Sequence, residues 1–318
     1  MDLSLNRRAA SLADRMEEEA KLLHIAVRRL GNGTRVIDCG VEVEGGLDAG
    51  RRLAEVCLAS LATVRLTSAD VTGLGLPAVE VVTDHPVIAC LASQYAGWLI
   101  DPSGYTAMGS GPARTLARVE RELYGKIRYA ESCDRAVLVL ESRALPDERV
   151  AAFVAERCGL PPGALTLLVA PTASMAGAVQ VAARAVETGM HKMLELGFDV
   201  AKVRSGLGVS PVAPVAANDV RAIGWTNDCL LYGGRAYFAV HATDQEIETL
   251  IEQLPAVASP DYGRPFEELF NRYGGDFYKI DPLLFSPARV TINNLATGRV
   301  LSAGRLNPEV LRASLGLP

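Results

Sequence analysis

Residues 132–258 alternate short continuous apolar runs with longer segments of helical periodicity, and this alternation is the strongest constraint on the fold. The predicted order is strand, helix, strand, helix, over Ala136–Leu140, Pro146–Cys158, Leu165–Ala170 and Ser174–Leu196. Two strand-like runs and a helix follow, over Cys229–Tyr232, Ala236–His241 and Asp244–Leu254. Elements in this order can close an αβ sandwich, which predicts one domain over residues 132–258.

The two ends of the chain predict a second domain. The N-terminal part predicts a helix, a hairpin turning at Gly31-Asn32-Gly33, a second helix and a short strand, over Leu5–Leu23, Ile25–Val43, Leu47–Leu61 and Ala78–Thr83. Ala288–Leu306 predicts another hairpin with a similar turn, so we expect its strands to return to the N-terminal sheet. The predicted fold class is α+β, with a discontinuous αβ domain over 1–131 plus 259–318 beside the sandwich over 132–258.

Charge and composition exclude several kinds of partner. The formal net charge of −5, with no basic run among aromatic residues, disfavours nucleic acid. Apolar stretches end before the ~18 residues that span a bilayer, and Glu17–Glu19 lie where a signal peptide would be apolar, so we expect a cytoplasmic protein without membrane contact. Neither the six scattered cysteines nor His24, His85 and His241 have metal-ligand spacing, so we expect no metal.

The segment Gly109–Arg114 combines a glycine-rich turn with a serine, a proline and an arginine. Free backbone N–H groups at the start of a helix, here expected over Ala113–Tyr124, suit an anion such as a phosphate. The alternative is an ordinary helix start, with Ser110 as N-cap. Ser110 lacks glycines two residues away on each side, so it is not a nucleophile elbow.

The helix expected over Ser174–Leu196 carries a polar line beside its apolar stripe. Its members are Gln180, Arg184, Glu187, His191 and Glu195. Arg184 and Glu187 are three residues apart and can touch. Such a line is usually a solvated face, but this pair stands among small and apolar neighbours, which is typical of a cleft. Thr226-Asn227-Asp228 and Ser259–Gly263 are polar clusters that predict either turns or pocket loops.

Eight ordered blocks resemble the methenyltetrahydromethanopterin cyclohydrolase family. They are VIDCGV (Val36–Val41), HPVIACLASQYAGW (His85–Trp98), AMGSGPAR (Ala107–Arg114), LVAPTAS (Leu168–Ser174), TNDCLLYGGR (Thr226–Arg235), SPDYGRPF (Ser259–Phe266), DFYKID (Asp276–Asp281) and NNLATGRV (Asn293–Val300). Each block alone is a weak signal, but together they cover nearly the whole chain in family order.

The resemblance implies a function and a site. The family hydrolyses 5,10-methenyltetrahydromethanopterin to the N5-formyl compound, reversibly, without metal or other cofactor, and its Arg-x-x-Glu pair falls on Arg184 and Glu187. Glu187 is expected to take a proton from water, and Arg184 to hold it. The substrate is expected in a cleft between the two domains. The matching blocks imply that the pocket is lined by Ser93, Gln94, Gly109, Ser110, Thr172, Asn227 and Asp228. A homotrimer is implied by resemblance.

Three positions depart from the family pattern, and two other functions compete with the hydrolase. Tyr95 stands where several relatives have Lys, Pro260 where Ser is common, and Ala182-Ala183 where Ser-Gly often precedes the arginine. The family serves C1 metabolism, in methanogenesis and in formaldehyde oxidation, and the arginine bias favours a bacterial formaldehyde-oxidation setting. The alternatives are a phosphate-binding transferase that uses the Gly109–Arg114 turn and a non-catalytic pterin-binding protein.

Overall fold

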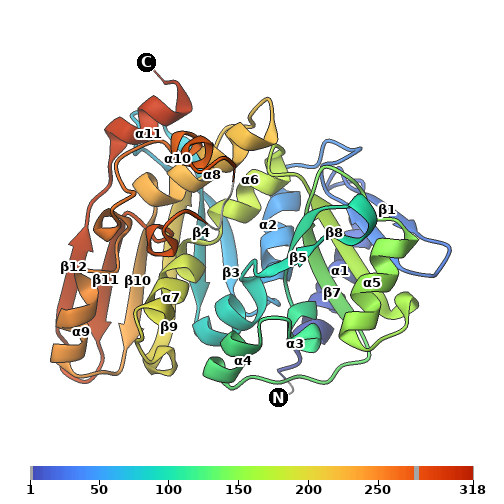
Figure 1. Cartoon of the computed structure of the whole chain (residues 1–318), viewed down its shortest axis with the longest axis horizontal. Helices are drawn as coiled ribbons and strands as arrows, with labels where there is room; N and C mark the ends of the chain where they lie inside the picture. The colour runs from blue at the N-terminus through green and yellow to red at the C-terminus, as the bar shows by residue number, and fades with distance from the viewer. Residues whose placement is uncertain (1–2, 276–278, 318) are drawn as a thin grey trace. The chain divides into compact units, whose positions relative to one another are not determined.

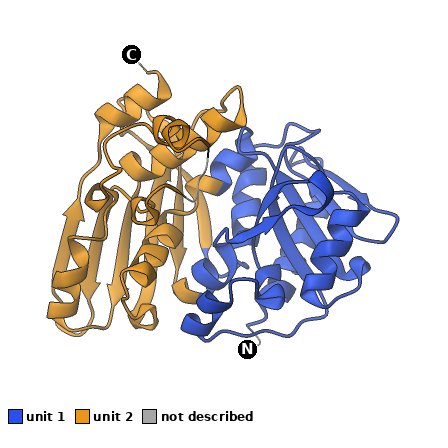
Figure 2. Ribbon diagram, in the orientation of Figure 1, with its two compact units in different colours: residues 1–62, 88–180 blue, residues 63–87, 181–318 orange. Residues whose placement is uncertain are grey.

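The computed structural model describes residues 3–275 and 279–317, which divide into two compact units (Figure 2). Unit 1 contains residues 1–62 and 88–180, and unit 2 contains residues 63–87 and 181–318. Asp276, Phe277 and Tyr278 of the DFYKID block lie outside the described residues. Each unit combines helices with a mixed sheet, which confirms the predicted α+β class.

The sheet of unit 1 is built around the two apolar runs that the sequence predicts as strands. Within the described residues it has six strands, in the order β1-β2-β8-β7-β6-β5. Their bounds are β1 Ala26–Arg29, β2 Arg35–Asp38, β5 Trp98–Ile100, β6 Ala107–Ser110, β7 Ala136–Glu141 and β8 Leu165–Ala170. β8 pairs in parallel with β7 and β2, and the remaining pairs are antiparallel. The predicted hairpin through Gly31–Gly33 is confirmed, with Ala26 opposite Asp38.

Helices cover both faces of this sheet (Figure 1). They are α1 Leu5–Glu18, α2 Leu47–Cys57, α3 Ala113–Ala117, α4 Arg121–Ile127, α5 Glu148–Cys158 and most of α6 Met175–Ala182, together with a π-helix over Val87–Gln94. Val137 and Val139 of β7 share a core with α1 and α2, whereas Leu138 and Leu140 share another with α3 and α5. Successive strand residues point to opposite faces, so a strand covered on both faces is apolar throughout.

The second sheet belongs to unit 2 and also has six strands in the part of the chain that is described, in the order β12-β11-β10-β9-β4-β3. Their bounds are β3 Thr63–Ala69, β4 Leu76–Thr83, β9 Val203–Pro211, β10 Arg235–Val240, β11 Arg289–Asn294 and β12 Val300–Gly304. The predicted C-terminal hairpin is present. It lies in one sheet with β4, the strand predicted over Ala78–Thr83, but not with β1 and β2, so its predicted return to the N-terminal sheet is correct only in part. β11 pairs in parallel with β10, where Ile292 lies opposite Phe238 and both are fully buried.

The helices of unit 2 are α7 Ala185–Glu195, α8 Asp219–Gly233, α9 Asp244–Ile251, α10 Phe266–Arg272 and α11 Pro308–Leu315. The strand predicted over Cys229–Tyr232 is wrong, because these residues form the last turns of α8. All four are buried, and residues of this run share a core with α10 and α11. A helix enclosed on several sides is apolar at consecutive positions, so periodicity alone cannot distinguish it from a buried strand.

The two units differ from the domains expected from sequence. β7 and β8 lie in one sheet, and β9 and β10 in the other, although all four belong to the expected 132–258 sandwich. The reason is that β8 pairs with β2, whereas β9 pairs with β4, so strand pairing joins distant parts of the chain in both sheets. Among residues 3–275 and 279–317, no helix has the length and apolar character needed to span a membrane.

Candidate active site

The helix predicted over Ser174–Leu196 is divided, and Arg184 lies at the division. α6 ends at Ala182, and α7 begins at Ala185 with Arg184 as its N-cap residue. The Arg184 carbonyl accepts hydrogen bonds from the Thr188 backbone N–H at 2.9 Å and from the Thr188 hydroxyl at 3.0 Å. This places Glu187 in the first turn of α7, where the unpaired N–H groups of the helix favour a negative charge.

Close packing against the sheet of unit 2 fixes this first turn. A Cβ added to Gly208 of β9 would lie 2.8 Å from the Cβ of Ala185, and one added to Gly206 would lie 2.6 Å from a methyl group of Val186. Gly189, one turn further along α7, similarly faces the ring of Phe238. The helix therefore packs very close to β9 and β10. Side chains in place of these glycines would prevent this close approach.

Arg184 and Glu187 form a buried ion pair. Arg184 Nη1 lies 3.6 Å from Glu187 Oε2, and the two side chains are only 10% and 5% exposed. The alternative of a solvated face is therefore wrong for these two residues. The solvated-face interpretation is correct further along the helix. There His191 Nε2 lies 3.6 Å from Glu195 Oε1, and the Glu195 side chain is 39% exposed.

This arrangement suits proton transfer to and from a small molecule. A carboxylate is acceptor-only when ionised and gains a donor when protonated, so one group can serve both directions. A neighbouring guanidinium favours its charged form and limits its rotation. The pair thus places a buried carboxyl group beside a guanidinium group at the start of α7.

Ser93 and Gln94 end the π-helix of unit 1, and Gly109 and Ser110 end β6. All four are buried. The Ser93 hydroxyl donates to the Cys57 carbonyl at 2.6 Å, and Ser110 Oγ lies 3.4 Å from Cys57 Sγ. A Cβ on Gly109 would lie 3.0 Å from the Trp98 carbonyl oxygen. These residues therefore contact the backbone and side chains of unit 1 closely.

The Gly109–Arg114 turn does not present its arginine to a ligand. Arg114 is fully buried, donates from Nε to Glu120 Oε1 at 2.8 Å, and donates from Nη1 to the Ser93 carbonyl at 3.0 Å. Its helix, α3, has only five residues and is capped by Pro112, so the predictions of a helix over Ala113–Tyr124 and of Ser110 as N-cap are wrong. The left-handed Arg118 (φ 48°) separates α3 from α4.

The remaining predicted pocket residues lie in two places. Thr172 follows β8 in unit 1 and donates its hydroxyl to the Glu141 carboxylate. Asn227 and Asp228 lie on α8 rather than in a turn, and Asn227 Nδ2 donates to the Ile223 carbonyl at 2.8 Å. Asp228 is fully buried and accepts from the Phe266 N–H at 3.0 Å and from the Ser314 hydroxyl. Burial raises the pKa of Asp228 to about 7.

Sequence reasoning missed Lys192, a buried cation on the same helix as Glu187. It is 1% exposed, and its ammonium donates to the Pro255 carbonyl at 2.8 Å. Burial lowers the pKa of Lys192 to about 8, opposed by the charge of Asp281. The available signal was its position between Met190 and Met193, which belong to the apolar stripe.

The cysteines and possible metal ligands form no cluster in the described part of the chain. Cys39, Cys57, Cys90 and Cys229 are buried thiols, and Cys133 and Cys158 are partly buried. Burial raises the pKa of the Cys39 and Cys229 thiols above the usual range. Among the described residues, no group of three or more His, Cys, Asp or Glu side chains is placed to hold a metal ion.

Comparison with known proteins gives matches over nearly the full length. Residues 4–315 match the family model described as Cyclohydrolase (MCH). Methenyltetrahydromethanopterin cyclohydrolase of Methanococcoides burtonii is 44% identical over 316 residues, covering 99% of both chains. Those of Methanosarcina barkeri and Methanococcus maripaludis strain C7 are 45% and 48% identical, covering 99% and 98% of each chain, respectively. The chain therefore belongs to the methenyltetrahydromethanopterin cyclohydrolase family.

Proposed function

We propose that this chain hydrolyses the methenyl bridge of 5,10-methenyltetrahydromethanopterin to give the N5-formyl compound, with Glu187 as base and acid and Arg184 as its positioning residue. The observation that carries the proposal is the buried Arg184–Glu187 pair at the start of α7, in a chain of this family. The methanogen sources of the curated relatives support a role in C1 metabolism.

The proposed reaction begins with water addition to the positively charged bridge. The water oxygen bonds to the bridging carbon while Glu187 takes one water proton. The C–N10 bond then breaks, and the protonated Glu187 gives its proton to N10. Loss of the remaining hydroxyl proton leaves the formyl group on N5, so the cation and water yield a neutral product and one proton.

Charge explains why a carboxylate serves this substrate. The bridging carbon is already electrophilic, so the protein need only position a water, remove a proton and return it to the leaving nitrogen. An ionised Glu187 complements the cation, whereas an unpaired arginine at this place would repel it. Pairing at 3.6 Å offsets the charge of Arg184, and a neighbouring guanidinium favours the ionised form of a carboxyl group.

Substitution of Glu187 tests the proposal. Glu187→Gln keeps the shape but cannot take a proton, so we expect kcat to fall by about 10²- to 10⁴-fold. KM should rise by a smaller factor, because Arg184 loses the charge of its partner. The measurement is the loss of the methenyl chromophore, with spontaneous hydrolysis subtracted. Glu195→Gln is the matched control, because it makes the same change on an exposed part of the same helix.

Two outcomes would contradict the proposal in different ways. Parental turnover by Glu187→Gln would show that another group is the base. If the parent chain bound the substrate but left its chromophore to decay at the spontaneous rate, the non-catalytic pterin-binding alternative would hold instead. The buried Arg114 gives no support to the transferase alternative, because its guanidinium is already bound to Glu120 and to the π-helix.

A further inference from the structure

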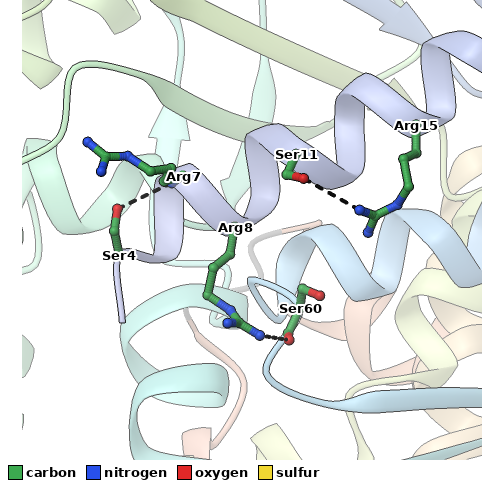
Figure 3. A pocket seen from close by; sticks show the side chains of 6 residues that line it. All are labelled: Ser4, Arg7, Arg8, Ser11, Arg15 and Ser60. Atoms are coloured by element: carbon green, nitrogen blue, oxygen red, sulfur yellow. Dashed lines mark hydrogen bonds between the residues drawn. The ribbon is translucent and has the colours of Figure 1, made fainter. Parts of the chain in front are cut away.

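A cavity that is largely open to solvent lies beside α1 in unit 1, and its lining residues are all arginine and serine. Its volume is about 410 Å³, and its lining residues are Ser4, Arg7, Arg8, Ser11, Arg15 and Ser60 (Figure 3). Five of the six belong to α1 or its N-cap, and Ser60 follows the end of α2. No carboxylate is among the lining residues.

Acidic residues in the second half of α1 and at its C-cap bind arginines that do not line this cavity. Asp14 and Glu17 both contact Arg35, at 2.7 and 2.8 Å, and Glu19, the C-cap residue, contacts Arg52 at 3.2 Å. Within residues 3–275 and 279–317, neither Arg8 nor Arg15 has a carboxylate within ion-pair distance. Although the whole chain has a net charge of −5, this cavity is therefore locally positive.

Arg8 is held in a fixed position by the end of α2. Its Nε donates to the Ala59 carbonyl at 3.2 Å, and its Nη2 donates to the Ser60 carbonyl at 2.7 Å. Ala59 and Ser60 both have left-handed backbone conformations, with φ of 52° and 55°, which non-glycine residues rarely adopt. The guanidinium retains N–H groups that these two bonds do not use.

Arg15 and Ser11 lie one turn apart on the same side of the cavity. Arg15 Nη1 donates to Ser11 Oγ at 3.4 Å (Figure 3), and both residues are exposed. Arg7 lies at the other end, 3.5 Å from Asp134, in an ion pair whose side chains are 63% and 78% exposed and therefore weakly coupled. Ser4 Oγ donates to Glu131, so the positive charge is concentrated around Arg8 and Arg15.

We propose that this cavity binds a small phosphorylated anion of the diphosphate class. Guanidinium groups and serine hydroxyls are the side chains that match phosphate oxygens. The volume lies in the range of small-ligand sites, and exceeds what a single phosphate fills. The site uses no residue of the proposed hydrolysis.

Inorganic pyrophosphate is the probe, titrated calorimetrically into the full chain at low ionic strength. We expect saturable binding that weakens as salt increases, because exposed charges are screened. Arg15→Gln should weaken binding by about fivefold or more, because it removes one guanidinium group with its charge and its paired N–H donors. Arg149→Gln, which removes an exposed arginine from α5 of the same unit, should leave the affinity unchanged.

A pair of substitutions at Ser11 separates charge from structure. Ser11 is exposed, so neither change should affect folding. Ser11→Ala should retain most of the binding, whereas Ser11→Asp places a carboxylate beside Arg15 and should reduce affinity by more than about tenfold. The methenyl hydrolysis rate without pyrophosphate should be the same in both variants and the parent, which keeps this test independent of Glu187.

Three results would overturn the proposal. The first is an absence of binding heat in the parent chain at millimolar pyrophosphate. The second is equal affinity in Arg15→Gln and Arg149→Gln. The third is a pair of observations: the parent chain does not bind pyrophosphate, and light scattering gives Arg15→Gln a different molecular mass from the parent. That result would show that the cavity is a contact between copies of the chain.

Discussion

At the scale of single residues, Asp228 shows how burial couples a carboxyl group to the stability of unit 2. Its oxygens accept hydrogen bonds from the N–H of Phe266, the first residue of α10, and from Ser314 of α11, so it connects α8 to both helices. Burial raises its pKa to about 7, with smaller contributions from Glu267 and Glu268. The folded chain therefore keeps a proton on Asp228 that the unfolded chain loses near pH 4.

This difference predicts a pH-dependent effect of Asp228→Asn. Between about pH 4 and pH 7 the folded state keeps the proton on Asp228 and the unfolded state does not. The contribution of Asp228 to the free energy of unfolding is therefore complete below about pH 4 and is lost as the pH rises to about 7. The asparagine variant cannot ionise and does not lose this stability. The difference between its free energy of unfolding and that of the parent should therefore rise by up to about 4 kcal/mol as the pH increases from 4 to 7. Urea denaturation at several pH values measures the difference.

The control for this experiment is Asp101→Asn, which changes an exposed aspartate whose side chain does not cap its helical turn. A constant difference between Asp228→Asn and the parent from pH 4 to pH 8 would show that Asp228 ionises normally in the folded chain.

The position of Asp228 on a buried helix could not be predicted from the sequence. The polar cluster Thr226-Asn227-Asp228 is typical of a turn or a pocket loop, because polar clusters give no information about which helices pack around them.

The candidate catalytic pair could be predicted at this scale, whereas the surroundings of Arg114 could not. Arg184 and Glu187 are three residues apart on a helix, and local geometry alone brings such residues together. Arg114 binds the carbonyls of Leu91, Ala92 and Ser93, far away in sequence. No local pattern predicts that a π-helix will present its carbonyl groups there.

At the scale of elements, the glycines of β9 determine where α7 lies. Gly206 and Gly208 leave room for Val186 and Ala185, the two residues that precede Glu187 in the chain. This strand was not predicted from the sequence, since small residues and prolines obscure its pattern, whereas β7 and β8 were predicted because their apolar runs are continuous. The packing that orients Glu187 was therefore not available from sequence periodicity.

Gly208→Ala should disturb this packing. The added methyl group would lie 2.8 Å from Ala185 Cβ and 3.0 Å from the Val186 nitrogen, so the first turn of α7 must move. We expect a loss of about 1–3 kcal/mol in unfolding free energy, and a lower kcat because Glu187 moves with the turn. Thermal denaturation and the chromophore assay measure the two effects.

Gly125→Ala provides the comparison, because apart from the adjacent backbone of α4 no atom lies within 4 Å of the added Cβ. It should leave kcat unchanged and should not destabilise the chain. If Gly208→Ala retained both the stability and the kcat of the parent, the close contact between β9 and α7 would not be what positions the carboxylate.

At the scale of the whole molecule, each unit is assembled from separate segments of the chain. Residues 63–87 belong to unit 2 although they lie between two segments of unit 1. A fragment of residues 132–258 contains β7 and β8 without β2 and β6, and β9 and β10 without β4 and β11. We expect this fragment to show no cooperative thermal transition by circular dichroism, while the full chain shows one. A sharp transition in the isolated fragment would argue for an autonomous 132–258 domain.

The placement of β3 and β4 has a consequence for synthesis on the ribosome. All strands of the first sheet precede residue 181, so that sheet can form while translation continues. The β3–β4 hairpin emerges early but must wait for β9, its partner in the second sheet, with the β4 edge open. A nascent chain thus carries this unpaired edge until β9 is synthesised, which makes the hairpin a segment that benefits from chaperone protection.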